Sequence, residues 1–154
     1  MSSVHIDLQI ACDFPGLPDA SLMEKWSAAA VGGRKKRSEI SVRIVGPEEG
    51  RALNLQWRQK DYATNILSFP AELPDIIHSS LLGDLVICAP VVEREAQEQG
   101  KTLMEHWAHM VIHGTLHLLG YDHIEEIDAK EMEAIEKKAL LGLGYPDPYK
   151  DDQL

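Results

Sequence analysis

The sequence predicts an α/β (α+β-like) fold, with a small mixed β-sheet of about four strands packed by about five helices. Three observations predict it. Short runs with apolar residues at every second position alternate along the chain with stretches whose apolar residues recur at helical spacing. The chain has 154 residues, of which 44% are hydrophobic, and this is enough to fill one core. No internal repeat, low-complexity tract or linker interrupts it, so residues 1–154 are expected to form a single domain.

The first third of the chain predicts strand, helix and strand in that order. Residues 4–10 alternate apolar and polar side chains, which is typical of a strand with one buried face. Asp19 is a good N-cap for a helix, and apolar residues follow it at helical spacing until Gly32 and Gly33 end the pattern. Residues 41–45 then repeat the alternation and predict the second strand.

The middle of the chain predicts a second helix, two strands and a third helix. Pro47 suits the first turn of a helix, and residues 64–69 form a β-prone run that is followed by a proline. Residues 71–80 are expected to be a loop. Residues 83–88 are strongly β-prone, and residues 90–100 predict a helix that has proline in its first turn and glycine at its end.

Two further helices complete the predicted fold. Thr102 and Glu105 have the form of a capping box, so a helix is expected from about Thr102 to Leu119. Gly120 is placed to end this helix in a left-handed conformation. The acidic stretch from about residue 125 to 143 carries apolar side chains on one face and predicts a last amphipathic helix.

The charge is unevenly distributed along the chain. The formal net charge is −10, and residues 122–154 hold ten acidic residues against four lysines. A net negative charge argues at first sight against a nucleic-acid partner, because phosphate binding usually needs a basic surface. The first 121 residues are nearly balanced, however, and include the basic run 34–37 followed by Arg43 and Arg58. These cations are expected to form either a local positive surface or a plain solvated loop.

The two cysteines, Cys12 and Cys88, stand alone, without the spacing of a metal-binding or redox motif. The N-terminus has no basic start followed by a long apolar run, and no segment approaches the roughly 20 apolar residues that cross a bilayer. A cytoplasmic protein with reduced thiols and no membrane partner is therefore expected.

The stretch that carries most chemistry contains three histidines, His113, His117 and His123. Residues four apart lie on one face of a helix, so the imidazoles of His113 and His117 can converge on one ion at the roughly 2.0–2.1 Å that zinc requires. Gly120 allows the chain to fold back and bring His123 as a third ligand. Three protein ligands leave a fourth position for water, as in catalytic zinc sites, and Asp122 is a candidate to orient a ligand or that water. The sequence therefore predicts a hydrolase with one Zn²⁺ per chain, held on a metal-bearing helix in the core.

Other interpretations of this stretch compete with a catalytic zinc site. Backbone carbonyls would also satisfy His113 and His117, and nickel or copper would also accept three imidazoles. His106 and His109 lie on the same helical stripe and are expected to be surface or packing residues, with support of the metal ligands as the alternative. The spacing also fits the metzincin proteases, but Gly114 stands where their catalytic glutamate belongs, and a glycine cannot act as a general base.

Several strings in the chain match one known family. They are HGTLHLLGYDH at residues 113–123, TNILSFP at 64–70, GDLVI at 83–87, and the single residues Leu53, Asn54, Arg58 and Asp61. Through them the chain resembles the YbeY family of bacterial endoribonucleases over about residues 50–145. One departure is Asn65, where many members carry Asp, and either side chain is expected to hydrogen-bond locally.

The resemblance implies a metal-dependent endoribonuclease that prefers single-stranded RNA and serves 16S rRNA 3′-end maturation and ribosome quality control. Its implied partners are ribosomal RNA, the small ribosomal subunit and assembly factors. It implies zinc ligands at His113, His117 and His123 and a functional arginine at Arg58, whose guanidinium can bind two phosphate oxygens. The cations expected to bind a single strand along a groove are Lys35, Arg37, Arg43 and Arg58.

Two functions of other classes remain as alternatives. A zinc metalloprotease-like hydrolase would need a general base close to the metal, for which Asp122 is the local candidate. A ribosome-assembly factor would use the metal only to hold the last two helices together. Loss of His117 would then unfold the domain instead of leaving a folded, inactive protein.

Overall fold

Four strands form one mixed sheet within residues 3–35, 37–71, 80–121 and 126–149, the part of the chain that the computed structural model describes. In the spatial order β1-β2-β4-β3 they are β1 (Ser3–Ala11), β2 (Arg37–Val45), β4 (Leu81–Cys88) and β3 (Ile66–Pro70). The first three are parallel, and β3 runs antiparallel to β4 at one edge. The predicted mixed sheet of about four strands is confirmed.

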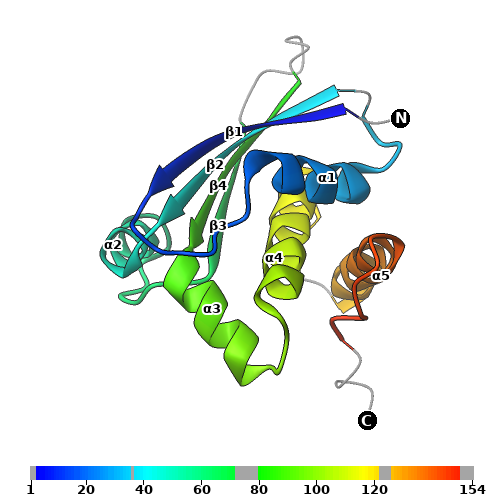
Figure 1. Cartoon of the computed structure of the whole chain (residues 1–154). Coiled ribbons are helices and arrows are strands. Elements are labelled where there is room, and N and C mark those ends of the chain that lie inside the picture. The colour runs from blue at the N-terminus through cyan, green and yellow to red at the C-terminus, as the bar shows by residue number, and fades with distance from the viewer. Residues whose placement is uncertain (1–2, 36, 72–79, 122–125, 150–154) are drawn as a thin grey trace.

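Five helices pack around this sheet in the same part of the chain. They are α1 (Ala20–Val31), α2 (Pro47–Arg58), α3 (Ala89–Glu98), α4 (Leu103–Leu118) and α5 (Glu126–Gly142). Figure 1 shows α1 and α4 against one face of the sheet and α5 beyond them, where it contacts both. The helix α2 lies near the end of the sheet, beside α3. The α/β prediction with about five helices is therefore also confirmed.

The residues from which the helix ends were predicted do form those ends in the structure. Oδ1 of Asp19 accepts a hydrogen bond from the Leu22 N–H at 2.8 Å, which caps α1. Oγ1 of Thr102 accepts one from the Glu105 N–H at 3.2 Å, which caps α4. Gly120 has a φ of +105°, so the chain leaves α4 through a conformation that glycine adopts readily.

The core lies between the sheet and the layer formed by α1 and α4. Its largest side chains are two tryptophans, Trp26 on α1 and Trp107 on α4, each 1% exposed. They pack in one cluster with the inward side chains of the sheet, among them Ile40, Ile44 and Leu85. Burial of each such side chain contributes about 1.5–3 kcal/mol to folding. Most residues of α4 are buried, which confirms that the helix with the predicted metal ligands lies in the core.

Gly114 sets how closely α4 approaches the sheet. A Cβ at this position would lie 2.6 Å from Cδ1 of Ile66 on β3 and 2.8 Å from Cδ2 of Leu85 on β4. Real Cβ atoms do not come this close to another carbon, so any larger residue would push α4 away from the sheet. The position that holds glutamate in metzincins therefore faces the core here, between the two histidines of α4.

The remaining sequence predictions differ from the structure in detail. The third strand starts at Ile66, two residues later than predicted, where Oδ1 of Asn65 accepts the Ile66 N–H at 2.7 Å. This confirms the expected local hydrogen bond of Asn65. Most of the predicted 71–80 loop lies outside the described residues. Cys12 and Cys88 are both free thiols. Among the described helices none has the length and apolar character that crossing a membrane requires.

Candidate functional site

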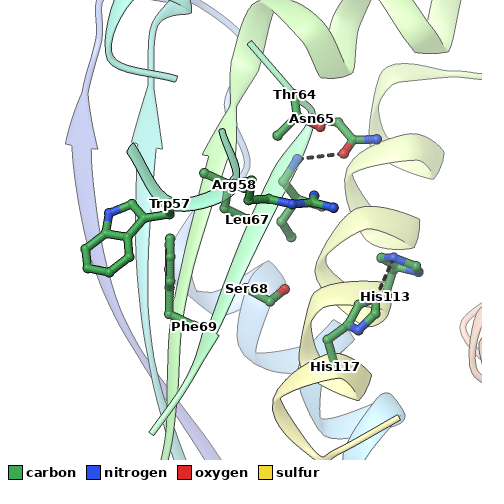
Figure 2. Close-up of a pocket in the computed structure, with 10 residues that line it drawn as sticks. Trp57, Arg58, Thr64, Asn65, Leu67, Ser68, Phe69, His113 and His117 are labelled. Carbon is green, nitrogen blue, oxygen red and sulfur yellow. Dashed lines mark hydrogen bonds between the residues drawn. The ribbon is translucent and has the colours of Figure 1, made fainter. Parts of the chain in front are cut away.

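A pocket of about 590 Å³ lies where the end of α2, the edge strand β3 and the second half of α4 meet (Figure 2). The residues that line it are Trp57, Arg58, Thr64, Asn65, Ile66, Leu67, Ser68, Phe69, His113 and His117. The fold thus brings Arg58 into the same pocket as two of the three predicted metal ligands, although more than 50 residues of sequence separate them.

The two imidazoles in the pocket converge through their Nε2 atoms. The Nε2 atoms of His113 and His117 are 3.1 Å apart, and Figure 2 shows both rings on the pocket side of α4. Two nitrogens bound to one tetrahedral zinc ion at about 2.0–2.1 Å are separated by about 3.3 Å. The pair therefore fits two positions of a zinc ion with little adjustment.

The rest of the predicted metal site falls outside the described residues. His123 and Asp122 belong to the stretch 122–125, of which the structure describes nothing. Within the described stretches, no group of three His, Cys, Asp or Glu side chains comes together as a metal site. The three-histidine site and the role of Asp122 therefore remain predictions, to which the geometry of His113 and His117 lends support.

Behind His113 lies a buried carboxylate that the sequence analysis did not single out. Glu136 on α5 is fully buried, and its Oε1 accepts a hydrogen bond from Nδ1 of His113 at 2.6 Å. Its Oε2 accepts bonds from Nε2 of His109, at 3.3 Å, and from the Tyr149 hydroxyl. Burial alone would raise the pKa of Glu136, but the hydrogen bonds and charges of His109 and His113 outweigh it and lower the pKa to about 2. Glu136 is therefore ionised at neutral pH.

A second carboxylate, Glu95 on α3, contacts one residue of the pocket lining, Asn65, and one buried histidine of α4. It accepts a hydrogen bond from Nε2 of His106 at 2.9 Å and another from the side-chain amide of Asn65 at 3.1 Å. Burial opposes ionisation of Glu95, but the bonds from His106 and Asn65 outweigh it and lower its pKa. The side-chain amide of Asn65 thus donates a hydrogen bond to Glu95. An aspartate at position 65 could not do so, because its carboxylate would face the carboxylate of Glu95.

His106 and His109 are neither surface residues nor simple packing residues. They are 2% and 7% exposed, and each donates a hydrogen bond to one of the two carboxylates. Burial lowers the pKa of His109, and the bond to Glu136 only partly opposes this. The expectation of a surface position is therefore wrong for both, and the alternative of supporting residues fits the observed contacts.

Arg58 and Trp57 stand at the mouth of the pocket. Both are exposed, and Figure 2 shows the Arg58 guanidinium extending toward α4. Trp57 is 60% exposed as a residue, and its ring meets the Phe69 ring edge to face, with centroids 5.7 Å apart. The pocket therefore has a cation that extends toward the helix carrying the imidazoles, and an open aromatic surface beside it.

The other predicted cations lie elsewhere. Lys35 and Arg37 are exposed at the start of β2, and neither lines the pocket. The guanidinium of Arg43 makes a bidentate ion pair with Glu49, which lowers the pKa of that carboxyl. Arg43 lines a different hollow, on the sheet face opposite α4, that shares only its aromatic rim with the pocket. Of the four cations predicted to bind RNA, the structure places Arg58 alone at this pocket.

The sequence alone contains a signal for Glu136, which lies within a stripe of apolar residues on one face of α5. It lies four residues after Met132 and four before Leu140, and both of these are buried on α5. An acidic residue within an apolar helical stripe is expected to have a buried partner. It escaped notice because it is one of many acids in the C-terminal region.

Comparison with known proteins gives a consistent result. The family model described as Endoribonuclease YbeY matches residues 19–144. A protein named Endoribonuclease YbeY from Stutzerimonas stutzeri is 59% identical over 149 residues, which are 96% of this chain and 93% of that protein. A protein of the same name from Pseudomonas putida is 57% identical over 151 residues, 97% of this chain and 96% of that protein.

A solved structure supports the fold independently. A Thermotoga maritima protein determined in solution superposes with a TM-score of 0.57 and 24% sequence identity, covering 93% of this chain and 99% of that chain. At this identity the likeness concerns the fold alone. The chain therefore has the overall fold of a protein whose structure has been solved.

Proposed function

This chain belongs to the endoribonuclease YbeY family, and on that premise we propose that it is a zinc-dependent endoribonuclease that cleaves single-stranded RNA in the pocket between α2, β3 and α4. We extend the proposal to a cytoplasmic role in 16S rRNA 3′-end maturation and ribosome quality control. Its partners would then be ribosomal RNA, the small ribosomal subunit and assembly factors. The names of the family and its relatives support the RNA substrate, and the cellular role rests on the resemblance of the motifs.

One observation carries the proposed chemistry: Arg58 and the imidazole pair of His113 and His117 line a single pocket. Cleavage of a phosphodiester places negative charge on the non-bridging oxygens of the phosphorus. A guanidinium binds two such oxygens at once, and its charge is not lost at any physiological pH. A zinc ion held by His113, His117 and the predicted ligand His123 would supply Lewis-acid stabilisation of the same charge.

The preference for single strands follows from the aromatic rim. The exposed face of Trp57 is a platform on which an unpaired base can stack, and Phe69 supports it from the side. A base in a duplex is already stacked and paired, so it would have to be unpaired before it reached this surface. Arg58 is the next residue after Trp57, and it would hold the phosphate that follows the stacked base.

The nucleophile is settled by the products. If the ribose 2′-hydroxyl attacks, the RNA fragments end in a cyclic or 3′ phosphate. If water attacks, they carry a 3′ hydroxyl and a 5′ phosphate. End-group analysis of the fragments distinguishes the two routes, and both use the same residues for charge stabilisation.

The test is cleavage of a labelled single strand and of the matching duplex by wild type, His113→Ala and Arg58→Glu, with and without a chelator. We expect wild type to cut the single strand faster than the duplex and to lose activity with the chelator. Both variants should lose at least about 100-fold in rate, the usual scale for a lost group that stabilises transition-state charge. Arg94→Glu is the matched charge reversal, since Arg94 is exposed on α3 and does not line the pocket.

Each outcome bears on the proposal. Cleavage that survives Arg58→Glu would remove the electrostatic part of it. A wild-type protein that binds RNA but never cuts it would favour the assembly-factor alternative, and circular dichroism of His117→Ala would then show whether the metal holds the fold. Cleavage of casein without cleavage of RNA would favour the protease alternative.

A further inference from the structure

Glu136 is the most deeply buried charge in the described part of the chain, and its environment is specific. It has no exposed surface, and three donors surround it: two imidazoles of α4 and the Tyr149 hydroxyl near the C-terminus. An ionised carboxylate is costly to bury unless such donors replace its water. The three contacts therefore account for an ionised carboxylate that has no exposed surface.

An ionised carboxylate accepts hydrogen bonds and donates none, so it dictates where its partners carry hydrogen. The 2.6 Å contact requires a hydrogen on Nδ1 of His113. In the neutral imidazole the lone pair then lies on Nε2, the atom that faces Nε2 of His117 in the pocket. One carboxylate thus selects the tautomer of His113 that can bind a metal through Nε2.

The contacts of the neighbouring His109 point to the opposite tautomer. Its Nε2 lies 3.3 Å from Oε2 of Glu136 and 3.2 Å from the Tyr149 hydroxyl oxygen. Because that hydroxyl gives its own hydrogen to Glu136, Nε2 of His109 is the donor in these contacts. Its Nδ1 is buried, and the described residues offer it no hydrogen-bond partner, as expected for the unprotonated nitrogen of a neutral ring. His109 therefore supports Oε2 of the carboxylate, while Oε1 is left to His113.

From these contacts we propose that Glu136 is a positioning residue for the metal, one that fixes the tautomer and ring orientation of His113. Tyr149 and His109 hold the carboxylate in place through its other oxygen. This inference rests on the proposed function, because it takes His113 to be a zinc ligand. A carboxylate that accepts the second nitrogen of a ligating histidine also makes the ligand more basic and raises metal affinity.

A purely structural role is the competing explanation. Glu136 joins α5 to α4, so its loss could weaken the packing of the two helices without any effect specific to the metal. A structural role would lower the free energy of unfolding and would leave the affinity of the folded protein for Zn²⁺ unchanged. Metal affinity measured on folded protein therefore separates the two explanations.

The first experiment measures the dissociation constant for Zn²⁺, by competition with a chromophoric chelator, for wild type, Glu136→Gln and Glu95→Gln. The glutamine side chain keeps the shape of Glu136, but its amide cannot accept from donors on both sides. We expect Glu136→Gln to bind Zn²⁺ about 10- to 100-fold more weakly. Glu95→Gln is the matched control, because Glu95 also accepts from a histidine of α4, but from His106, which is not a predicted metal ligand. It should bind Zn²⁺ within about twofold of wild type.

The second experiment needs no variant and keeps the proposal testable should Glu136→Gln fail to fold. Nitrogen-15 correlation spectra of metal-free wild type at alkaline pH report which ring nitrogen of each neutral histidine carries hydrogen. We expect hydrogen on Nδ1 of His113 and on Nε2 of His109. Hydrogen on Nε2 of His113 would overturn the proposal, as would unchanged Zn²⁺ affinity in folded Glu136→Gln. A wild type that does not bind Zn²⁺ would instead overturn the proposed function.

Discussion

Replacing Gly114 by alanine sets two known effects against each other, and the structure decides between them. In a helix interior, alanine is more favourable than glycine by about 1 kcal/mol. Here the new Cβ would lie 2.6 Å from Ile66 and 2.8 Å from Leu85, which are 8% and 0% exposed and have little room to move. Overpacking of this kind costs about 1–3 kcal/mol. We therefore expect Gly114→Ala to lower the free energy of unfolding by about 1 kcal/mol, and at most by about 2.

Urea denaturation followed by circular dichroism measures this change. Gly142→Ala is the control, because Gly142 ends α5 and a Cβ there meets no atom within 4 Å. The control should be neutral or stabilised by up to about 1 kcal/mol, so only Gly114→Ala should lower the free energy of unfolding. For a protein of this size 1 kcal/mol corresponds to about 2–4 °C in Tm. If Gly114→Ala gained as much stability as the control, close contact between α4 and the sheet would be refuted.

The same position tests the protease alternative. Gly114→Glu restores the glutamate of the metzincin motif, but places its carboxylate against Ile66 and Leu85 in the core. We expect a loss of stability of several kcal/mol, typical of an unpaired buried charge, and no peptidase activity. A folded Gly114→Glu variant that cleaved peptides would show that this position faces the pocket instead.

Three further changes probe the rim and the second carboxylate. Trp57→Ala should weaken the binding of single-stranded RNA by roughly 5- to 150-fold, which corresponds to the loss of about 1–3 kcal/mol of base stacking. The control is Leu55→Ala, on the exposed side of α2, which should leave the RNA affinity unchanged. Fluorescence titration measures both affinities. The folded pKa of Glu95 lies below its usual value of 4.5, so its ionised form stabilises the fold above that pH and loses this contribution as the pH falls through the lowered pKa. Between pH 6 and 3, the free energy of unfolding measured by urea denaturation should therefore fall less steeply for Glu95→Gln than for wild type. An equal dependence on pH in the two proteins would contradict the contact with His106. Asn65→Asp should lower the free energy of unfolding by about 1–3 kcal/mol at pH 8. The loss should be smaller at pH 4, where one of the two facing carboxylates can take up a proton. Adding Glu95→Gln in a double variant should restore the lost stability.

Local signals in the sequence were enough for the elements but not for their assembly. Asp19, Thr102 and Gly120 act through their own neighbours, so their roles at helix ends could be predicted from sequence alone. The insertion of β4 between β2 and β3 depends on contacts between distant segments, which no local pattern contains. The start of β3 was misjudged because the β-prone run includes Asn65, whose side chain instead bonds to the Ile66 N–H.

In the candidate site, too, local spacing predicted some residues, whereas contacts between distant segments determine the place of others. His113 and His117 could be paired from spacing, because one turn of a helix fixes their separation. Arg58 entered through the family motif, and its place opposite the histidines depends on how α2 and α4 pack around β3. Glu136 was missed because its partner lies 23 residues away on another helix, although its position in an apolar stripe marks it as unusual.

The line of histidines on α4 is difficult to explain by stability. His106 and His109 are buried and bound to carboxylates, and His113 shares one of these. Buried charged pairs seldom stabilise a fold more than well-packed apolar side chains of similar volume, because desolvation offsets most of the attraction. A helix selected only for stability would therefore carry apolar residues here. Ionised carboxylates behind this helix are reasonable if they orient groups that act in the pocket. Each carboxylate also holds its imidazole partner in one tautomer, where a ring without such a partner would exchange between two.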